Sequence, residues 1–387
     1  MASQMNARGR VCFHAVYLYP VLSSGAVEMA GGAEVQQALL ARGLARRGFD
    51  VSAVTCDFGQ ARELAVDGVR LLRSYAPGSG VPVLRFFHPR LSLTMRALLK
   101  ADAEVYYARG AGIYSGEAFE VARWKRAAFV LGTAHDEDVY KSLPRLHGIR
   151  DRWWALRTVK GADAIIAQSE FQRSLYRSEF GRESEVVPNL VEIPAAGVDS
   201  GQPGEVVWLG TYKESKRPQW FTELARRFPQ QRFVMCGMPT NTLGPWEAAQ
   251  AAARECPNLE VRGFVEHDKL AELLSRAALF VHTSPSEGFP NTLLEAWAHG
   301  LPGIAAVDPD GVIRREGLGE FVESLDELES AVRRWLADPA LRRAAGERAR
   351  AYVSAMHAPD NVLERYASFL DRMVDRVRER RKRGARA

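Results

Sequence analysis

The sequence predicts an α/β protein with two doubly wound domains, each built on a parallel sheet. Short apolar segments alternate with helical segments along both halves of the chain, as in repeated strand–helix–strand units. This alternation stops between residues 188 and 204, which contain three prolines and three glycines without a helical period. The 387 residues, 47% of them apolar, are enough for two separate cores.

The first half of the chain is predicted to form an N-terminal domain over residues 1–190. Strands are predicted at residues 11–17, 51–56, 69–73, 103–107, 127–131, 164–167 and 185–187. Helices are predicted at residues 33–47, where Gly48 ends the segment, and at 91–100 and 169–180.

The second half is predicted to form a C-terminal domain over residues 205–358, after a linker at 191–204. Its strands are predicted from Val206 and at 232–236, 259–262, 279–283 and 303–307, with helices at 220–228, 269–276 and 292–299. Residues 359–387 are predicted to form a long helix, from 361 to about 380, with a basic tail.

The net positive charge is concentrated in that tail. Residues 371–387 carry eight Lys or Arg and three Asp or Glu, a net of +5, which equals the formal net charge of the whole chain. The rest of the chain is neutral overall, so its charge does not indicate nucleic-acid binding. The tail is interpreted either as a contact with anionic lipid headgroups or as a solvated helical end.

Cysteine usage and hydropathy are typical of a cytoplasmic protein. The four cysteines are scattered without the spacing of a zinc or redox site, which indicates reduced thiols. No apolar run approaches the roughly 20 residues that span a bilayer. An apolar stretch at 11–22 follows a basic flank, but His14 and Pro20 interrupt it, so we expect a first strand there rather than a signal peptide.

The segment 284–302 places two carboxylates around the start of a predicted helix. A helix start after a strand presents free backbone N–H groups and its positive dipole end at the carboxyl edge of a sheet, where phosphorylated ligands bind. Glu287 can accept from a sugar hydroxyl, and Glu295 can accept from the paired hydroxyls of a ribose. Alternatively, Glu295 follows Thr292 by three residues, which is the spacing of a capping box.

Glu287 and Glu295, with seven residues between them, resemble the paired glutamates of family 4 glycosyltransferases, which are retaining enzymes that use nucleotide sugars. Residues 31–36, 162–171 with 186–189, and 205–210 with 216–218 are similar to further segments of that family, in the expected order. The resemblance implies the GT-B fold, in which two Rossmann-like domains face each other across a cleft. It also implies that the C-terminal helix crosses back to the N-terminal domain.

The same resemblance implies roles for individual residues. Lys216, six residues after Gly210, would contact the diphosphate. The family often has a second phosphate cation where this chain has Thr211, so that cation is either missing here or replaced by Arg217 or Lys213. Glu287 and His135 would contact the transferred sugar and are the candidate catalytic residues. The implied donor-binding residues are Gly32, Gly210, Lys216, Arg217, Gly288, Phe289, Pro290, Asn291, Thr292 and Glu295.

His135 also has a structural interpretation, as a histidine at the end of a strand, and Asp136 to Asp138 would raise its pKa if they lie close to it. The two aspartates are also compatible with a metal site. The family's GT-B members need no metal, however, so the resemblance implies neither a metal nor a cofactor.

Other enzyme classes fit the sequence less well. Residues 20–32 lack a dinucleotide-binding glycine fingerprint, and residues 210–216 fail the spacing of a P-loop. A nucleotide-sugar epimerase, a phosphorylase of the same fold and a noncatalytic carbohydrate-binding relative stay open as alternatives.

The resemblance therefore implies a cytoplasmic retaining glycosyltransferase of carbohydrate biosynthesis. The nucleotide-sugar donor would bind the C-terminal domain, and a hydroxyl acceptor would enter along the N-terminal domain. The acceptor would be a glycan, a lipid-linked sugar or a natural product, selected by loops such as 75–90 and 110–117. Peripheral contact with an anionic membrane would go through the tail, and no nucleic-acid partner is expected.

Overall fold

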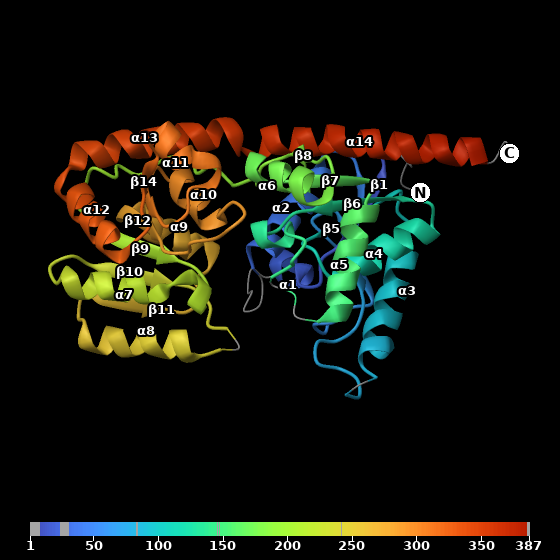
Figure 1. Cartoon of the computed structure of the whole chain (residues 1–387), viewed down its shortest axis with the longest axis horizontal. Coiled ribbons are helices and arrows are strands. Elements are labelled where there is room, and N and C mark those ends of the chain that lie inside the picture. Colours follow the sequence, from blue (N-terminus) through green and yellow to red (C-terminus); the bar gives the residue numbers. More distant parts are fainter. Residues whose placement is uncertain are drawn as a thin grey trace. The chain divides into compact units, whose positions relative to one another are not determined.

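The computed structural model describes residues 8–23, 31–82, 84–144, 146, 148–240 and 242–384 and divides the chain into two compact units (Figure 1). Unit 1 comprises the chain up to Leu190 together with the segment from Asp360 onward, and unit 2 comprises Val191–Pro359. Both units are α/β with a mostly or wholly parallel sheet, which is the predicted fold class.

Unit 1 is built on an eight-stranded sheet with the order β3-β4-β2-β1-β5-β6-β7-β8. All neighbours pair in parallel except β3 and β4, which form an antiparallel hairpin. The strands are β1 Arg10–His14, β2 Asp50–Thr55, β3 Glu63–Val66, β4 Val69–Arg73, β5 Val105–Arg109, β6 Ala128–Gly132, β7 Ala164–Ala167 and β8 Glu185–Val186. The strand order reverses between β1 and β5, and ligands bind beyond the carboxyl ends of the strands at such a point.

Helices connect the strands of unit 1. They are α1 Leu18–Ser23, α2 Gly32–Arg46, η1 Phe86–Leu91, α3 Ser92–Ala101, α4 Ile113–Trp124, η2 Asp136–Asp138, α5 Ile149–Gly161, α6 Glu170–Leu175 and η3 Tyr176–Phe180. The first strand ends at His14 rather than at Tyr17, because α1 begins at Leu18 with Pro20 in its first turn, where proline is tolerated.

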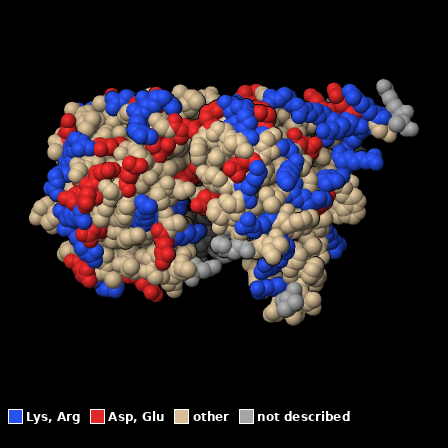
Figure 2. Space-filling view, viewed as in Figure 1, with Lys and Arg blue, Asp and Glu red and all other residues tan. Residues whose placement is uncertain are grey.

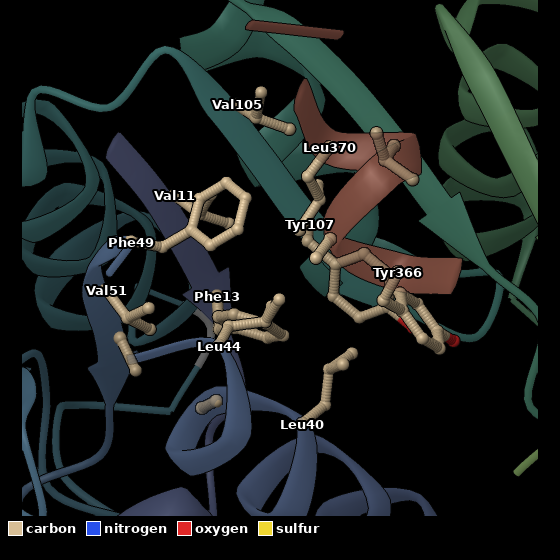
Figure 3. Close-up of a cluster of buried hydrophobic side chains, with 14 of the residues drawn as sticks. Val11, Phe13, Leu40, Leu44, Phe49, Val51, Val105, Tyr107, Tyr366 and Leu370 are labelled. Carbon is tan, nitrogen blue, oxygen red and sulfur yellow. The ribbon is translucent and has the colours of Figure 1, made fainter. Parts of the chain in front are cut away.

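The last helix, α14 Pro359–Gly384, completes the core of unit 1. Tyr366 and Leu370 are buried in one cluster with Val11 and Val105 of the central strands (Figure 3). The tail cations Arg372, Arg378 and Arg380 pair with Glu185, Glu104 and Asp163 at 2.6, 2.8 and 2.8 Å. The C-terminal helix is thus an integral part of unit 1, and several of its charges are already neutralised.

Unit 2 is built on a six-stranded parallel sheet with the order β11-β10-β9-β12-β13-β14. Its strands are β9 Glu205–Leu209, β10 Phe233–Cys236, β11 Leu259–Arg262, β12 Ala277–His282, β13 Gly303–Ala305 and β14 Gly319–Phe321. In chain order this is the 3-2-1-4-5-6 arrangement of dinucleotide-binding domains, and its switch point lies between β9 and β12.

The helices of unit 2 are η4 Glu214–Lys216, α7 Pro218–Arg227, α8 Gly244–Glu255, α9 His267–Ser275, α10 Asn291–Ala298, η5 Pro309–Gly311, α11 Val312–Glu316, α12 Leu325–Ala337 and α13 Pro339–Met356. Residues 191–204, for which we predicted a linker, form no helix or strand and pack onto unit 2. The Val198 N–H donates to the His299 carbonyl at 2.7 Å, and the buried Arg342 guanidinium donates to the Ser200 carbonyl at 2.8 Å.

All four cysteines, Cys12, Cys56, Cys236 and Cys256, are buried and unpaired. Within the part of the chain that the structure describes, none of the helices has the length and apolar composition to cross a bilayer.

Candidate functional site

Two loops meet at the carboxyl edge of the unit 2 sheet, at its switch point. One follows β9 and leads through η4 to Lys216, and the other follows β12 and leads to α10. The Thr283 hydroxyl donates to the Lys216 carbonyl at 2.5 Å and accepts from the Trp208 indole N–H at 2.9 Å. The two loops are therefore held to each other and to the buried end of β9.

Glu287 and Lys216, predicted from separate motifs, form an ion pair across these loops. Burial would raise the pKa of Glu287, but the charge of Lys216, the nearby His282 and hydrogen bonds from Lys216 and Ser284 lower it below its ordinary value. Glu287 is therefore ionised at neutral pH, and it can only accept hydrogen bonds.

His282 ends β12 and was not singled out from the sequence. Its Nε2 lies 3.8 Å from Glu287 Oε1, and burial lowers its pKa to about 4. The imidazole is therefore neutral at pH 7. The only sequence signal for this position was its place at the end of an apolar run, directly before the loop that carries Glu287.

Glu295 lies on α10 and has a different environment. The helix begins at Asn291 after Pro290, so Thr292 is inside the helix and the capping box considered as an alternative does not form. Within the described residues, no side chain or backbone N–H donates to the Glu295 carboxylate, and burial raises its pKa to about 7. The carboxylate is thus available to a ligand that brings its own donors.

The first turn of α10 supplies further predicted residues. Asn291 and Thr292 are its first two residues, and Gly288 and Pro290 lie in the loop before it. The Phe289 ring packs into the core, with its centroid 5.0 Å from that of His357 and 6.4 Å from that of Trp297. Phe289 can therefore contact a ligand at this edge only through its backbone.

The loop after β9 approaches other backbone closely at Gly210. A methyl group at Gly237, after β10, would collide with the Gly210 carbonyl oxygen, so the two loops need glycine at position 237 to pack this tightly. Arg217 follows Lys216 in the left-handed conformation, with φ of 48°, and its guanidinium lies 4.7 Å from the centre of the Trp220 ring. Both cations are thus fixed beside the switch point.

The remaining predicted residues belong to unit 1. Gly32 is the first residue of α2, and residues 24–30 before it lie outside the described part of the chain. His135 follows β6, and its Nδ1 accepts from the Glu137 N–H at 3.2 Å, which leaves Nε2 as its protonated nitrogen. Asp138 Oδ2 accepts from the His135 N–H at 3.1 Å, so the acidic cluster orders this turn.

Unit 1 also contains a buried pair that the sequence did not reveal. His14 ends β1, and its Nδ1 donates to the Tyr114 carbonyl at 2.7 Å, so its Nε2 is the nitrogen 3.8 Å from Oε2 of Glu117 on α4. Burial lowers the pKa of His14 to about 4 and raises that of Glu117 to about 8. At pH 7 both side chains are therefore neutral, at the switch point of the unit 1 sheet.

Two Rossmann-like units, one of which gathers a carboxylate, a lysine and a helix start at its switch point, form an arrangement at which α/β proteins commonly bind phosphorylated ligands. A family model described as a glycosyl transferase 4-like domain matches residues 31–189, and a model described as glycosyl transferases group 1 matches residues 203–338. Together the two models match more than half of the chain, which therefore belongs to the glycosyltransferases that combine these domains.

Solved structures share the fold. Sucrose-phosphate synthase from Thermosynechococcus elongatus is 19% identical with a TM-score of 0.74, over 94% of this chain and 98% of that one. HepE from Anabaena, in complex with UDP, is 15% identical with a TM-score of 0.68, over 93% and 99%. WaaG, a glycosyltransferase of lipopolysaccharide biosynthesis, is 16% identical with a TM-score of 0.67, over 92% and 98%. The chain has the GT-B fold. None of the curated proteins matches it significantly.

Proposed function

We propose that this glycosyltransferase moves a sugar, with retention of configuration, from a nucleoside diphosphate sugar to a hydroxyl acceptor. The observation that carries the proposal is the arrangement at the unit 2 switch point, where Lys216 pairs with the ionised Glu287 and Glu295 has a carboxylate without a donor. Lys216 suits a diphosphate, Glu287 a sugar hydroxyl and Glu295 a ribose, and a nucleoside diphosphate sugar contains all three parts.

In the proposed complex, the diphosphate lies at the start of α10 and takes Lys216 as its counterion. Glu287, released from that ion pair, accepts from a hydroxyl of the donor sugar. Glu295 accepts from the ribose hydroxyls, which keep its carboxylate ionised in place of the missing protein donors. HepE from Anabaena, which shares the fold of this chain, has been crystallised with UDP and with UDP-glucose. These complexes support a nucleotide sugar as the donor.

The chemical step breaks the bond between the sugar's anomeric carbon and the phosphate oxygen, whose electron pair stays on the nucleoside diphosphate. The acceptor oxygen forms its bond on the same face of the sugar and passes its proton to the departing phosphate. Lys216 and the α10 dipole stabilise the charge that develops on this leaving group. Glu287 supports the positive charge that develops on the sugar ring.

His135 is proposed to donate from Nε2 to the transferred sugar, and the acceptor is proposed to bind along unit 1. The reaction is proposed to need neither a metal nor a cofactor, since Lys216 and the helix start provide the positive charge. We also propose that the protein is cytoplasmic and makes a peripheral contact with a membrane. Acceptor and donor nucleotide are the parts to be identified by experiment.

The test is titration calorimetry with UDP, GDP and ADP, followed by the corresponding glucose conjugates. One of these nucleotides should bind to the wild-type protein. Lys216→Ala should then lower the affinity for that nucleoside diphosphate more than the affinity for the corresponding nucleoside. Lys269→Ala, which removes a solvent-exposed lysine paired with Glu266, is the matched control and should bind as wild type does. An equal loss for diphosphate and nucleoside would remove Lys216 from the phosphate site. Proton NMR of the product in the presence of a chelator then decides the anomeric configuration and the metal requirement.

A further inference from the structure

Two adjoining hollows lie on unit 1, at the amino ends of β6 and β7. The first has a volume of about 610 Å³ and is lined by four arginines: Arg123, Arg126, Arg380 and Arg381. The second has a volume of about 450 Å³, and its lining includes Trp153, Leu156, Arg157 and Lys160. They share Phe119, Arg123 and Gly161, so the arginine hollow opens directly beside a second cationic hollow that also has Trp153 in its lining.

The positive charge of the first hollow is mostly uncompensated. Its one acidic residue is Asp163, which accepts from Arg380 at 2.8 Å and from the Phe129 N–H at 3.0 Å. Arg381 donates to the Lys125 carbonyl at 3.5 Å and its charge helps to lower the pKa of Asp102, and Arg123 lies 5.6 Å from the centre of the Phe119 ring. Arg126 has no acidic partner among the described residues. Three guanidinium groups therefore remain for an anion, and guanidinium binds phosphate in a bidentate manner.

Tryptophan is exposed to solvent in the second hollow and next to Arg123 in the chain. Trp153 is 53% exposed, and Trp124, between Arg123 and Lys125, is 70% exposed. Buried tryptophan contributes to a core, but exposed tryptophan beside arginine is typical of the boundary between a membrane and water, where its ring is apolar and its N–H is polar. The combination of phosphate-binding and interfacial side chains matches the headgroup region of a bilayer.

This surface is distinct from the predicted substrate side of unit 1. Arg126, Ala127 and Asp163 directly precede β6 and β7, whereas His135 follows the carboxyl end of β6. The two sets of residues thus lie at opposite edges of one sheet. Figure 2 shows basic side chains gathered over unit 1 near the end of α14, interrupted by a few acidic ones.

We propose that this surface docks unit 1 onto an anionic membrane. The arginine hollow takes a lipid phosphate, and Trp124 and Trp153 enter the interface beside it. The inference rests on the membrane contact included in the proposed function, but it moves that contact from the tail alone to a surface that α4, α5 and the end of α14 build together. It does not depend on the donor chemistry of unit 2.

The experiment is co-sedimentation with vesicles of phosphatidylglycerol and phosphatidylcholine, compared with vesicles of phosphatidylcholine only. The double variant Arg123→Glu/Arg126→Glu should lower the partition coefficient onto anionic vesicles by at least about thirtyfold, because each Arg near such a surface contributes about 1 kcal/mol. Arg254→Glu/Arg276→Glu reverses two exposed arginines of unit 2 and changes the net charge equally. This control should bind as wild type does.

Trp124→Ala/Trp153→Ala, with all charges kept, should also weaken binding and should leave the salt dependence unchanged. Equal losses in the two arginine double variants would mean that net charge alone drives binding, and this would overturn the docking surface. Failure of wild type to bind anionic vesicles would overturn both the surface and the proposed membrane contact. Nucleotide affinity, measured on the same samples, tests unit 2 separately.

Discussion

Replacing Glu117 by glutamine should remove a pH dependence from the stability of unit 1. Glu117 is buried 3.8 Å from His14, and its pKa is raised from 4.5 to about 8. Between these two pH values the folded state holds a proton that the unfolded state has lost. The free energy of unfolding therefore falls with rising pH, by about 1.4 kcal/mol per pH unit, until the pH passes the folded pKa.

His14 acts in the opposite direction and limits the pH window. Its pKa is lowered from 6.5 to about 4, so the unfolded state holds the extra proton between these values, and its contribution to stability rises with pH there. The two effects nearly cancel below pH 6.5, and from pH 6.5 to about 8 only that of Glu117 remains. Over this window the free energy of unfolding of the wild type should fall by about 2 kcal/mol, whereas that of Glu117→Gln should not show this fall.

The assay is urea unfolding of unit 1 at both ends of that window, with wild type and variants measured in parallel. Glu120→Gln is the matched control, because Glu120 is on the same helix but accepts from Arg157 at 2.5 Å near the surface. It should keep the wild-type pH dependence. If Glu117→Gln and wild type change equally between the two pH values, Glu117 is ionised in the folded protein, and our account of the buried pair is wrong.

Three further predictions concern other parts of the chain. Glu295→Ala should weaken nucleotide binding by about 1.5 to 3 kcal/mol in calorimetry, the size of a lost hydrogen bond to a charged group, and unchanged affinity would refute its ribose contact. Gly237→Ala should destabilise unit 2 by about 1 to 3 kcal/mol in urea unfolding, because the new methyl group collides with Gly210, and wild-type stability would show that the loops can separate. A chain ended at Leu370 should melt well below wild type in unit 1, since it lacks the buried Met373, Val374 and Val377; an unchanged melting temperature would contradict their place in the core.

The regular elements could be predicted because their signals are local. Residues 69–73, 164–167 and 259–262 were predicted as strands with the bounds that the structure gives to β4, β7 and β11. The short edge strand β3 was missed, although Asp67 and Gly68, both with positive φ, are the residues that a two-residue hairpin turn requires. Strand β14 was missed because three half-buried residues carry no periodic signal.

The candidate site could be predicted only as far as its motifs extend along the chain. Lys216 and Glu287 were each chosen from a local pattern, but their ion pair depends on β9 and β12 being neighbours, which sequence order does not show. The pair of His14 and Glu117 was not predicted for the same reason. Two residues about a hundred positions apart meet only because β1 lies beside β5, whose following helix carries Glu117.

Unit 1 is built from two separate segments of the chain, and this has a consequence for the order of folding during synthesis. Unit 2 is one continuous segment, so the ribosome has released all of it before the last helix emerges. The core of unit 1 needs Tyr366, Leu370 and Val377, and these follow unit 2 along the chain. Although most of unit 1 precedes unit 2 along the chain, unit 1 can therefore complete its fold only after all of unit 2 has been made, and its apolar strands stay uncovered on one side until the last helix emerges.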